Sequence, residues 1–127
     1  MWLSINEKDN RPIYLQIINQ IREQVGKGTL KPGAELPSVR ELAQSLGINL
    51  HTVRGAYLKL RDQGIIELRL GRKARIARLP APLNRRDAEA QLSQKIKELV
   101  TEAQLAGVSR EHLHRLIDRQ MEGKGEE

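Results

Sequence analysis

A short run of side chains near the middle of the sequence could do chemistry. Within six positions the chain holds Asn49, Leu50, His51, Thr52 and Arg54. Arginine can donate two parallel hydrogen bonds to guanine, and asparagine pairs in the same two-bond manner with adenine. Threonine and histidine bind either bases or phosphates. For the leucine two roles are open: contact with a thymine methyl group or packing beside the hydrophobic core. These residue types favour contact with the base edges of a nucleic acid.

The helix that carries this run is predicted to begin at Asn49, a favourable N-cap residue, and to end at Gly64. Its apolar residues recur at helical spacing and are expected to form a buried face. They are Val53, Ala56, Tyr57 and Leu60. At about 100° per residue, His51 and Gly55 then point away from the core. Gly55 has two interpretations: it lets the backbone come close to DNA, or it is a tolerated surface glycine.

Two further helices are predicted before this one. Pro12 precedes a first helix, in which apolar side chains between residues 14 and 25 recur at helical spacing. Ser38 and Glu41 have the spacing of a capping box. A second helix is therefore expected to begin after Ser38 and to end at Gly47, with a short turn before the third.

The stretch after the third helix is rich in cations. Ile66, Leu68 and Leu70 alternate with polar residues as in a half-buried strand, and residues 74–78 are predicted to return after a glycine turn. Between residues 68 and 79 there are five cationic residues and no acidic one. The five are Arg69, Arg72, Lys73, Arg75 and Arg78. Two of them, Lys73 and Arg75, also fit an ordinary solvated cationic face.

Three helices followed by a basic hairpin predict a winged helix-turn-helix, in a chain that is mainly α-helical with a small β-hairpin. In this motif the N-terminal part of the third helix enters the major groove of DNA. The formal net charge of +6 agrees with a polyanionic partner. With one Trp, two Tyr and no Phe, the chain has too few rings for the base stacking of single-strand binders, which favours double-stranded DNA.

The sequence from residue 28 to residue 67 resembles the DNA-binding domain of the GntR family of bacterial transcription factors. The resemblance rests on PGAELPSVRELA, with the pattern P-G-x-x-L-P-S-x-R-x-L-A, and on TVRGAY, with the pattern T-V-R-x-A-Y. The opening MWLSIN, the following PIYLQI and the short two-helix C-terminus resemble the YtrA-type subfamily. The likeness extends over about residues 1–122 and implies a DNA-binding regulator.

DNA contact is expected at nine positions, and the resemblance implies eight of them. The family's DNA-contacting arginine of the second helix falls on Arg40, for which pairing with an acidic neighbour is the alternative. The wing-tip glycine that approaches the minor groove falls on Gly71. At Lys73 the chain departs from the second glycine that the family often has, which adds charge and leaves the shape of the wing open. The nine positions are Arg40, Asn49, Leu50, His51, Thr52, Arg54, Gly71, Arg72 and Lys73.

The C-terminal part is predicted to form a separate helical region. We expect the winged domain over residues 1–78, a linker over 79–84, two helices over 85–122 and a disordered tail over 123–127. Two helices alone have too little core to be stable, so their apolar seams are expected to pack against a second copy as a dimerisation hairpin. Folding back onto their own winged domain is the alternative. The predicted interface residues are Leu92, Ile96, Leu99, Ala103, Leu113, Leu116 and Ile117.

The sequence gives little support for catalysis. It has no cysteine, which excludes disulfides and thiolate chemistry. His112 and His114 fall on different helical faces, and His114 with Asp118 supplies only two ligands, so no metal, cofactor or enzyme activity is expected. We find neither a signal peptide nor a membrane-spanning stretch, and expect a cytoplasmic protein without membrane contact.

We therefore predict a homodimeric repressor of transcription that binds double-stranded DNA at an inverted-repeat operator. Two alternatives stay open: a partner-dependent adaptor whose C-terminal seam docks a different protein, and a non-specific nucleic-acid-binding protein. The C-terminal region is too short to enclose a ligand cavity of the usual size. A small-molecule effector at the dimer interface is left open.

Overall fold

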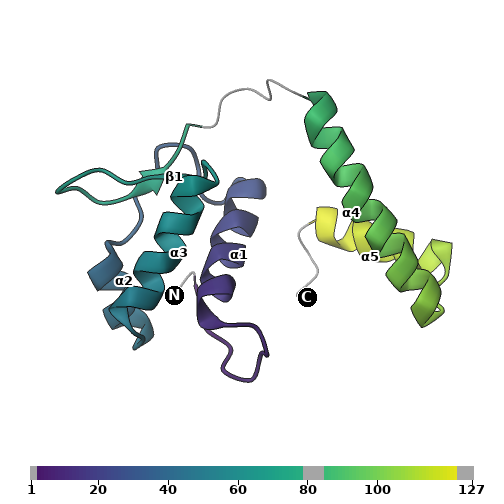
Figure 1. The fold of residues 1–127 in the computed structure, drawn as a ribbon, viewed down its shortest axis with the longest axis horizontal. Coiled ribbons are helices and arrows are strands. Elements are labelled where there is room, and N and C mark those ends of the chain that lie inside the picture. Colours follow the sequence, from purple (N-terminus) through teal and green to yellow (C-terminus); the bar gives the residue numbers. More distant parts are fainter. Residues whose placement is uncertain (1–2, 79–84, 123–127) are drawn as a thin grey trace. The chain divides into compact units, whose positions relative to one another are not determined.

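The computed structural model describes residues 3–78 and 85–122. It divides into two compact units, Met1–Pro80 and Ala81–Glu127, each of which is described by itself (Figure 1). The first unit holds helices α1 (Ile13–Gly26), α2 (Val39–Leu46) and α3 (Leu50–Asp62) and strands β1 (Ile66–Glu67) and β2 (Arg75–Ile76). The second unit holds α4 (Arg85–Ala106) and α5 (Arg110–Met121). The predicted linker, residues 79–84, and tail, residues 123–127, lie outside the described residues.

Local side-chain signals set the bounds of α2 and α3. Ser38 and Glu41 form the predicted capping box: the backbone N–H of Glu41 donates to Ser38 Oγ (3.0 Å), and that of Ser38 donates to Glu41 Oε1 (2.9 Å). Gly47 ends α2 with a φ of +67°, which glycine adopts without a steric penalty. Asn49 caps α3, because its Oδ1 accepts the backbone N–H of His51 at 2.7 Å. The predicted starts of both helices are confirmed.

The core of the first unit lies between α1, α2 and α3. Helix α3 packs against both of the other helices, as the ribbon shows (Figure 1). The predicted buried face of α3 is confirmed, since all four of its apolar residues are buried. Burial of such side chains is the main force that drives folding, at about 25 cal/mol per Å² of apolar surface. The other fully buried large side chains include Leu3, Ile17, Ile21, Leu36 and Leu42.

A small sheet closes one side of this core. Strands β1 and β2 pair in antiparallel fashion, Ile66 with Ile76 and Glu67 with Arg75. The segment before α2 lies along the other edge of β2, where its backbone forms hydrogen bonds of 2.8 Å with Ala74 and Ile76. Both isoleucines are buried. Three helices and this hairpin form the predicted winged helix-turn-helix, and the hairpin is its wing.

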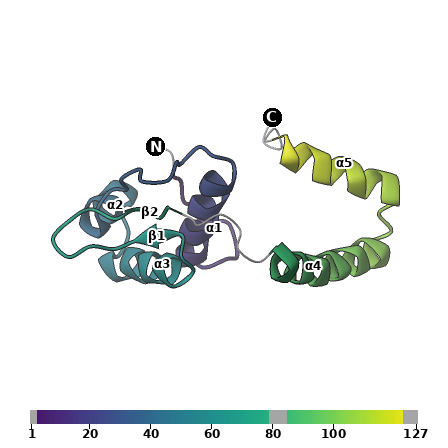
Figure 2. The same cartoon turned by 90° about the horizontal axis from the view of Figure 1, so that it is seen from above.

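The wing differs from the strand that the alternating sequence predicts. Leu70 was expected on the buried side of a strand, but the pairing ends at Glu67 and the Leu70 side chain is fully exposed, at 103 %. The prediction was wrong because the layer of core side chains beneath β1 does not extend that far. The chain turns instead, with the N–H of Arg72 donating to the carbonyl of Arg69 at 3.1 Å. The resulting loop projects beyond α2 in both views (Figures 1 and 2).

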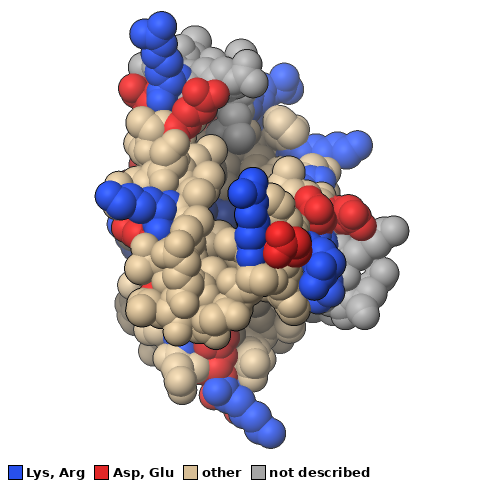
Figure 3. Space-filling view, turned by 90° about the vertical axis from the view of Figure 1, so that its right-hand side faces the viewer, with Lys and Arg blue, Asp and Glu red and all other residues tan. Residues whose placement is uncertain are grey.

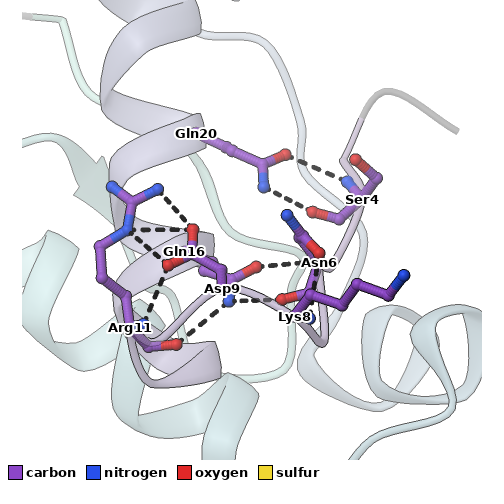
Figure 4. A network of polar contacts seen from close by, with 7 residues as sticks. All are labelled: Ser4, Asn6, Lys8, Asp9, Arg11, Gln16 and Gln20. Carbon is purple, nitrogen blue, oxygen red and sulfur yellow. Dashed lines mark hydrogen bonds and ion pairs between the residues drawn. The ribbon is translucent and has the colours of Figure 1, made fainter.

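A polar network holds the N-terminal segment against α1 (Figure 4). Gln16 is only 4 % exposed. Its Oε1 accepts the N–H of Asn6 (2.9 Å), and its Nε2 donates to the carbonyls of Asn6 and Arg11 (both 3.1 Å). Gln20 forms two hydrogen bonds with the backbone of Ser4, accepting its N–H and donating to its carbonyl. Neither glutamine stands out in the sequence, because amide side chains are mostly exposed in proteins.

The second unit is a splayed pair of helices. A turn at Gly107 separates α4 from α5, and Ser109 Oγ caps α5 by accepting the N–H of His112 at 3.1 Å, as predicted. Away from this turn the two helices make few contacts with each other (Figure 2). Most of their apolar side chains are therefore exposed. Among the described residues, no helix has the length and hydropathy needed to cross a membrane.

Candidate nucleic-acid interface

The first turns of α3 present the polar run to solvent. His51, Arg54 and Gly55 are exposed, and Thr52 is half-buried. They lie opposite or beside the buried face of α3, as the helical projection predicts. The aligned peptide dipoles of α3 give this N-terminal end of the helix a partial positive charge, which favours phosphate oxygens. The outward side of α3 can thus contact both bases and phosphates.

Asn49 does not have both ends of its amide free. Its Oδ1 already accepts the N–H of His51 at 2.7 Å, so the amide nitrogen is the group left to donate outward. A two-bond pairing with adenine would require the oxygen as well. In this structure Asn49 therefore positions the helix end, and its amide nitrogen is suited to a single hydrogen bond.

Leu50 borders a hollow that links α2, α3 and the wing. The Leu50 side chain is 38 % exposed, which is compatible with both of its sequence-based interpretations. The hollow has a volume of about 300 Å³ and an almost entirely apolar lining, to which Arg40 and Arg54 contribute the apolar parts of their side chains. It is lined by Val39, Arg40, Leu50, Arg54, Tyr57, Leu58 and Leu68. Arg40 and Arg54, from two different helices, are thereby brought to one place.

Arg40 is exposed on the first turn of α2. The alternative reading of Arg40, pairing with an acidic neighbour, finds no support, since no ion pair of Arg40 occurs among the described residues. A guanidinium group held on a rigid helix and left without a carboxylate is available to guanine or to a phosphate.

Gly55 occupies open space on α3. A Cβ placed there would meet no atom within 4 Å, and its backbone is not among the positive-φ glycines. Packing within the first unit therefore does not require glycine at this position. Glycine costs this helix about 1 kcal/mol relative to alanine, and the open space is compatible with both interpretations, close approach of DNA and a tolerated surface glycine.

The tip of the wing is a tight turn. The N–H of Arg72 bonds to Arg69, and Gly71 has a φ of +71°. Because no described non-glycine residue has a positive φ, Leu70 keeps a negative one, and the turn has the pattern of type II. Gly71 is thus required by the turn itself. The Arg72 side chain is exposed and forms no ion pair with any described residue.

Two other cations of the wing have carboxylate partners. Lys73 Nζ lies 3.4 Å from Glu41 Oε1, and Arg75 Nε lies 2.9 Å from Glu67 Oε1. The backbone N–H of Ser38 and the nearby Lys73 ammonium lower the pKa of Glu41. Lys73, predicted as a DNA contact, is therefore engaged with α2 in this structure. For Arg75 the pairing agrees with the alternative of an ordinary surface cation.

Two features of the site were not predicted from the sequence. The Tyr57 hydroxyl donates to the carbonyl of Pro37 at 2.7 Å, which ties α3 to the turn before α2. Burial raises the pKa of Tyr57 well above its usual value, so this phenol stays protonated and keeps donating. Arg69 Nε is shielded from water and has no acceptor among the described residues. Both depend on contacts between residues distant in sequence or on local burial.

The predicted interface residues of the second unit are partly available. Leu92, Ile96, Leu99, Leu116 and Ile117 are exposed, whereas Leu113 is half-buried. Ala103 is 8 % exposed, so it packs inside the unit, because it lies where α4 and α5 meet at the turn. In the described part of the chain, no three His, Cys, Asp or Glu side chains are grouped to hold a metal ion.

Comparison with known proteins places this geometry among DNA-binding regulators. The family described as "Bacterial regulatory proteins, gntR family" matches residues 13–76, the span from α1 to the end of β2. The HTH-type transcriptional repressor YtrA of Bacillus subtilis is 39 % identical over 115 residues, which are 91 % of this chain and 88 % of that protein.

Two solved structures of DNA-related or regulatory proteins are also similar to this chain. A transcriptional antiterminator from Listeria monocytogenes EGD-e has a TM-score of 0.86 at 34 % identity, covering 100 % of this chain and 95 % of that chain. The AraR DNA-binding domain in complex with operator ORX1 has a TM-score of 0.54 at 26 % identity, covering 61 % of this chain and 99 % of that chain. The structural likeness thus includes a domain bound to an operator.

Proposed function

The chain belongs to the gntR family of bacterial regulatory proteins and is a DNA-binding regulator of transcription, and from this premise we propose that it acts as a homodimeric repressor on an inverted-repeat operator. The predicted fold class and the absence of an enzymatic role agree with the family and its named relatives.

The DNA-reading surface is assigned to α2, α3 and the wing. We assign His51, Thr52 and Arg54 to base edges in the major groove, and their position on the outward side of the first turns of α3 supports this assignment. Arg40 borders the same hollow as Arg54 and is assigned to the same groove. Arg72, at the wing tip, is assigned to the DNA backbone or the minor groove.

The proposal of a dimer rests on the exposed apolar side chains of the second unit. Ile96 and Leu99 are 56 % and 43 % exposed in the single chain, because α4 and α5 are splayed. Figure 3, which faces this unit, shows broad uncharged areas between separate charged side chains. Such a surface marks an interaction site, and a second copy buries it on both partners at once.

A two-fold dimer presents two recognition helices, which is why an inverted repeat is the expected operator. Repression is proposed because the relative YtrA is named a repressor and because a bound dimer can block polymerase. We place the protein in the cytoplasm, where bacterial DNA lies. A small-molecule effector at the dimer interface stays a prediction.

Selection of random duplex DNA on the purified full chain, at about 150 mM salt, tests the proposal. We expect an enriched inverted repeat, together with a dimer mass in analytical ultracentrifugation. An enriched single half-site would contradict the dimer. Binding without any enriched sequence would instead support a non-specific or partner-dependent role.

A further inference from the structure

Among the described residues of the first unit, Leu70 is the most exposed large apolar side chain. It is 103 % exposed, compared with 42 % for Tyr14 and 38 % for Leu50. No other part of the described chain covers it. Single exposed leucines are common on protein surfaces and need no explanation by themselves. Leu70 differs because of how it is held and what surrounds it.

The turn at the wing tip presents Leu70 outward. Leu70 and Gly71 are the two central residues of the turn that the hydrogen bond from Arg72 to Arg69 closes. Gly71 supplies the positive φ that this turn requires, so the leucine is fixed at the apex of a narrow hairpin. The loop projects beyond α2 in both ribbon views (Figures 1 and 2).

The surroundings of Leu70 are cationic. Arg69 precedes it and Arg72 follows it closely, with no acidic residue between positions 68 and 79. An apolar protein partner would leave these guanidinium groups without acceptors, whereas a polyanion supplies acceptors on both sides. The ion pair of Lys73 with Glu41 also ties the wing to the first turn of α2, which carries Arg40. The tip therefore lies beside a helix of the DNA-reading surface.

We propose that Leu70 is a wedge that enters the minor groove of the bound duplex and partly unstacks one base step, thereby bending the DNA. Apolar side chains inserted from the minor groove bend DNA in this way, and flanking cations hold the phosphates. Pyrimidine–purine steps unstack most readily, so a TA or CA/TG step is expected at the contact. The inference rests on the proposed function only in requiring duplex DNA, and it requires no dimer.

The test uses the full chain and the selected operator with 2-aminopurine, whose fluorescence rises when it unstacks, placed at successive steps beside each half-site. Wild-type protein should raise the fluorescence roughly twofold or more at one step and bend the operator in a circular-permutation assay. Leu70→Ala should abolish both signals. Leu70→Met, which keeps a long apolar side chain, should retain them, and equal thermal unfolding of all three proteins should show that they fold.

Bending and fluorescence that are the same in Leu70→Ala as in wild type would overturn the wedge while leaving a sequence-specific regulator intact. A selection without any enriched sequence would overturn the proposed function instead. The wedge is then tested with 2-aminopurine beside TA steps in a duplex of mixed sequence, where the loss of signal in Leu70→Ala is still expected and its persistence contradicts the inference.

Discussion

Glu41 Oε1 accepts the backbone N–H of Ser38 at 2.9 Å and lies 3.4 Å from Lys73 Nζ. One carboxylate oxygen therefore caps α2 and holds the wing. This relationship connects the local structure of the helix-turn-helix with the position of the hairpin that follows it. It also engages Lys73, a cation that we predict to contact DNA, in an ion pair within the protein.

Replacing Glu41 with Gln tests this link. Glutamine still completes a capping box, so α2 is expected to form, but the ion pair is lost and Lys73 is released. We expect operator binding to become more salt-dependent, with the slope of log K against log salt steepening by about one. An unchanged slope in Glu41→Gln would show that Lys73 contributes equally to phosphate binding in both proteins.

Tyr57→Phe is expected to destabilise the first unit without changing its fold. The substitution removes the donor to the Pro37 carbonyl and leaves that acceptor without its partner, at a cost of about 1 kcal/mol in the free energy of unfolding. Urea unfolding followed by circular dichroism measures the effect. Equal midpoints for wild type and Tyr57→Phe would mean that water replaces the hydroxyl at no cost.

Arg40→Ala is expected to weaken operator binding by about 1–3 kcal/mol while leaving the unfolding transition unchanged. The reason is that Arg40 is exposed and unpaired in the described chain, so it contributes little to folding. Lys27→Ala is the matched control, because it also removes one positive charge but lies at the end of α1, paired with Glu23 at 3.5 Å. Equal losses in both variants would mean that Arg40 acts only through net charge.

Gly55→Ala separates the two interpretations of this glycine. Because a Cβ there meets open space, the variant should be more stable by about 1 kcal/mol. If the backbone of α3 approaches DNA at this position, operator affinity should fall at the same time. A more stable protein with wild-type affinity in a fluorescence-anisotropy titration would identify Gly55 as a tolerated surface residue.

Charged residues in the seam of α4 should prevent assembly. Ile96→Glu combined with Leu99→Glu is expected to give a monomer, because paired apolar side chains would become buried, unpaired charges. Sedimentation velocity reads the mass directly. Lys97→Glu, on the opposite side of the same helix, is the control and should stay dimeric. A dimer that survives the double substitution would place the interface elsewhere.

The sequence predicted the helix-turn-helix well because its signals are local. The capping box of Ser38 and Glu41 and the N-cap Asn49 act within three residues of their own positions. Each determines a helix boundary whatever the rest of the chain does. The buried face of α3 follows from the same local periodicity, and with it the outward placement of His51 and Arg54.

The wing was predicted less well because its extent depends on distant segments. Strand β2 is held by β1 on one edge and by the segment before α2 on the other, and it pairs only above the core. Leu70 alternates with polar neighbours as a buried strand residue would, yet nothing lies beneath it. An alternating sequence pattern shows only which side chains are apolar. It does not show where the core beneath the strand ends.

By itself, the sequence determined the three helices of the first unit, their order, the basic hairpin and the family, since each rests on residue types at short spacing. Only the tertiary structure decided which cations are free. Arg40 and Arg72 form no ion pair with described residues, whereas Lys73 and Arg75 meet Glu41 and Glu67. Charge pairing is a matter of distance in space, and residues 41 and 73 come within 3.4 Å only after the hairpin folds back to α2.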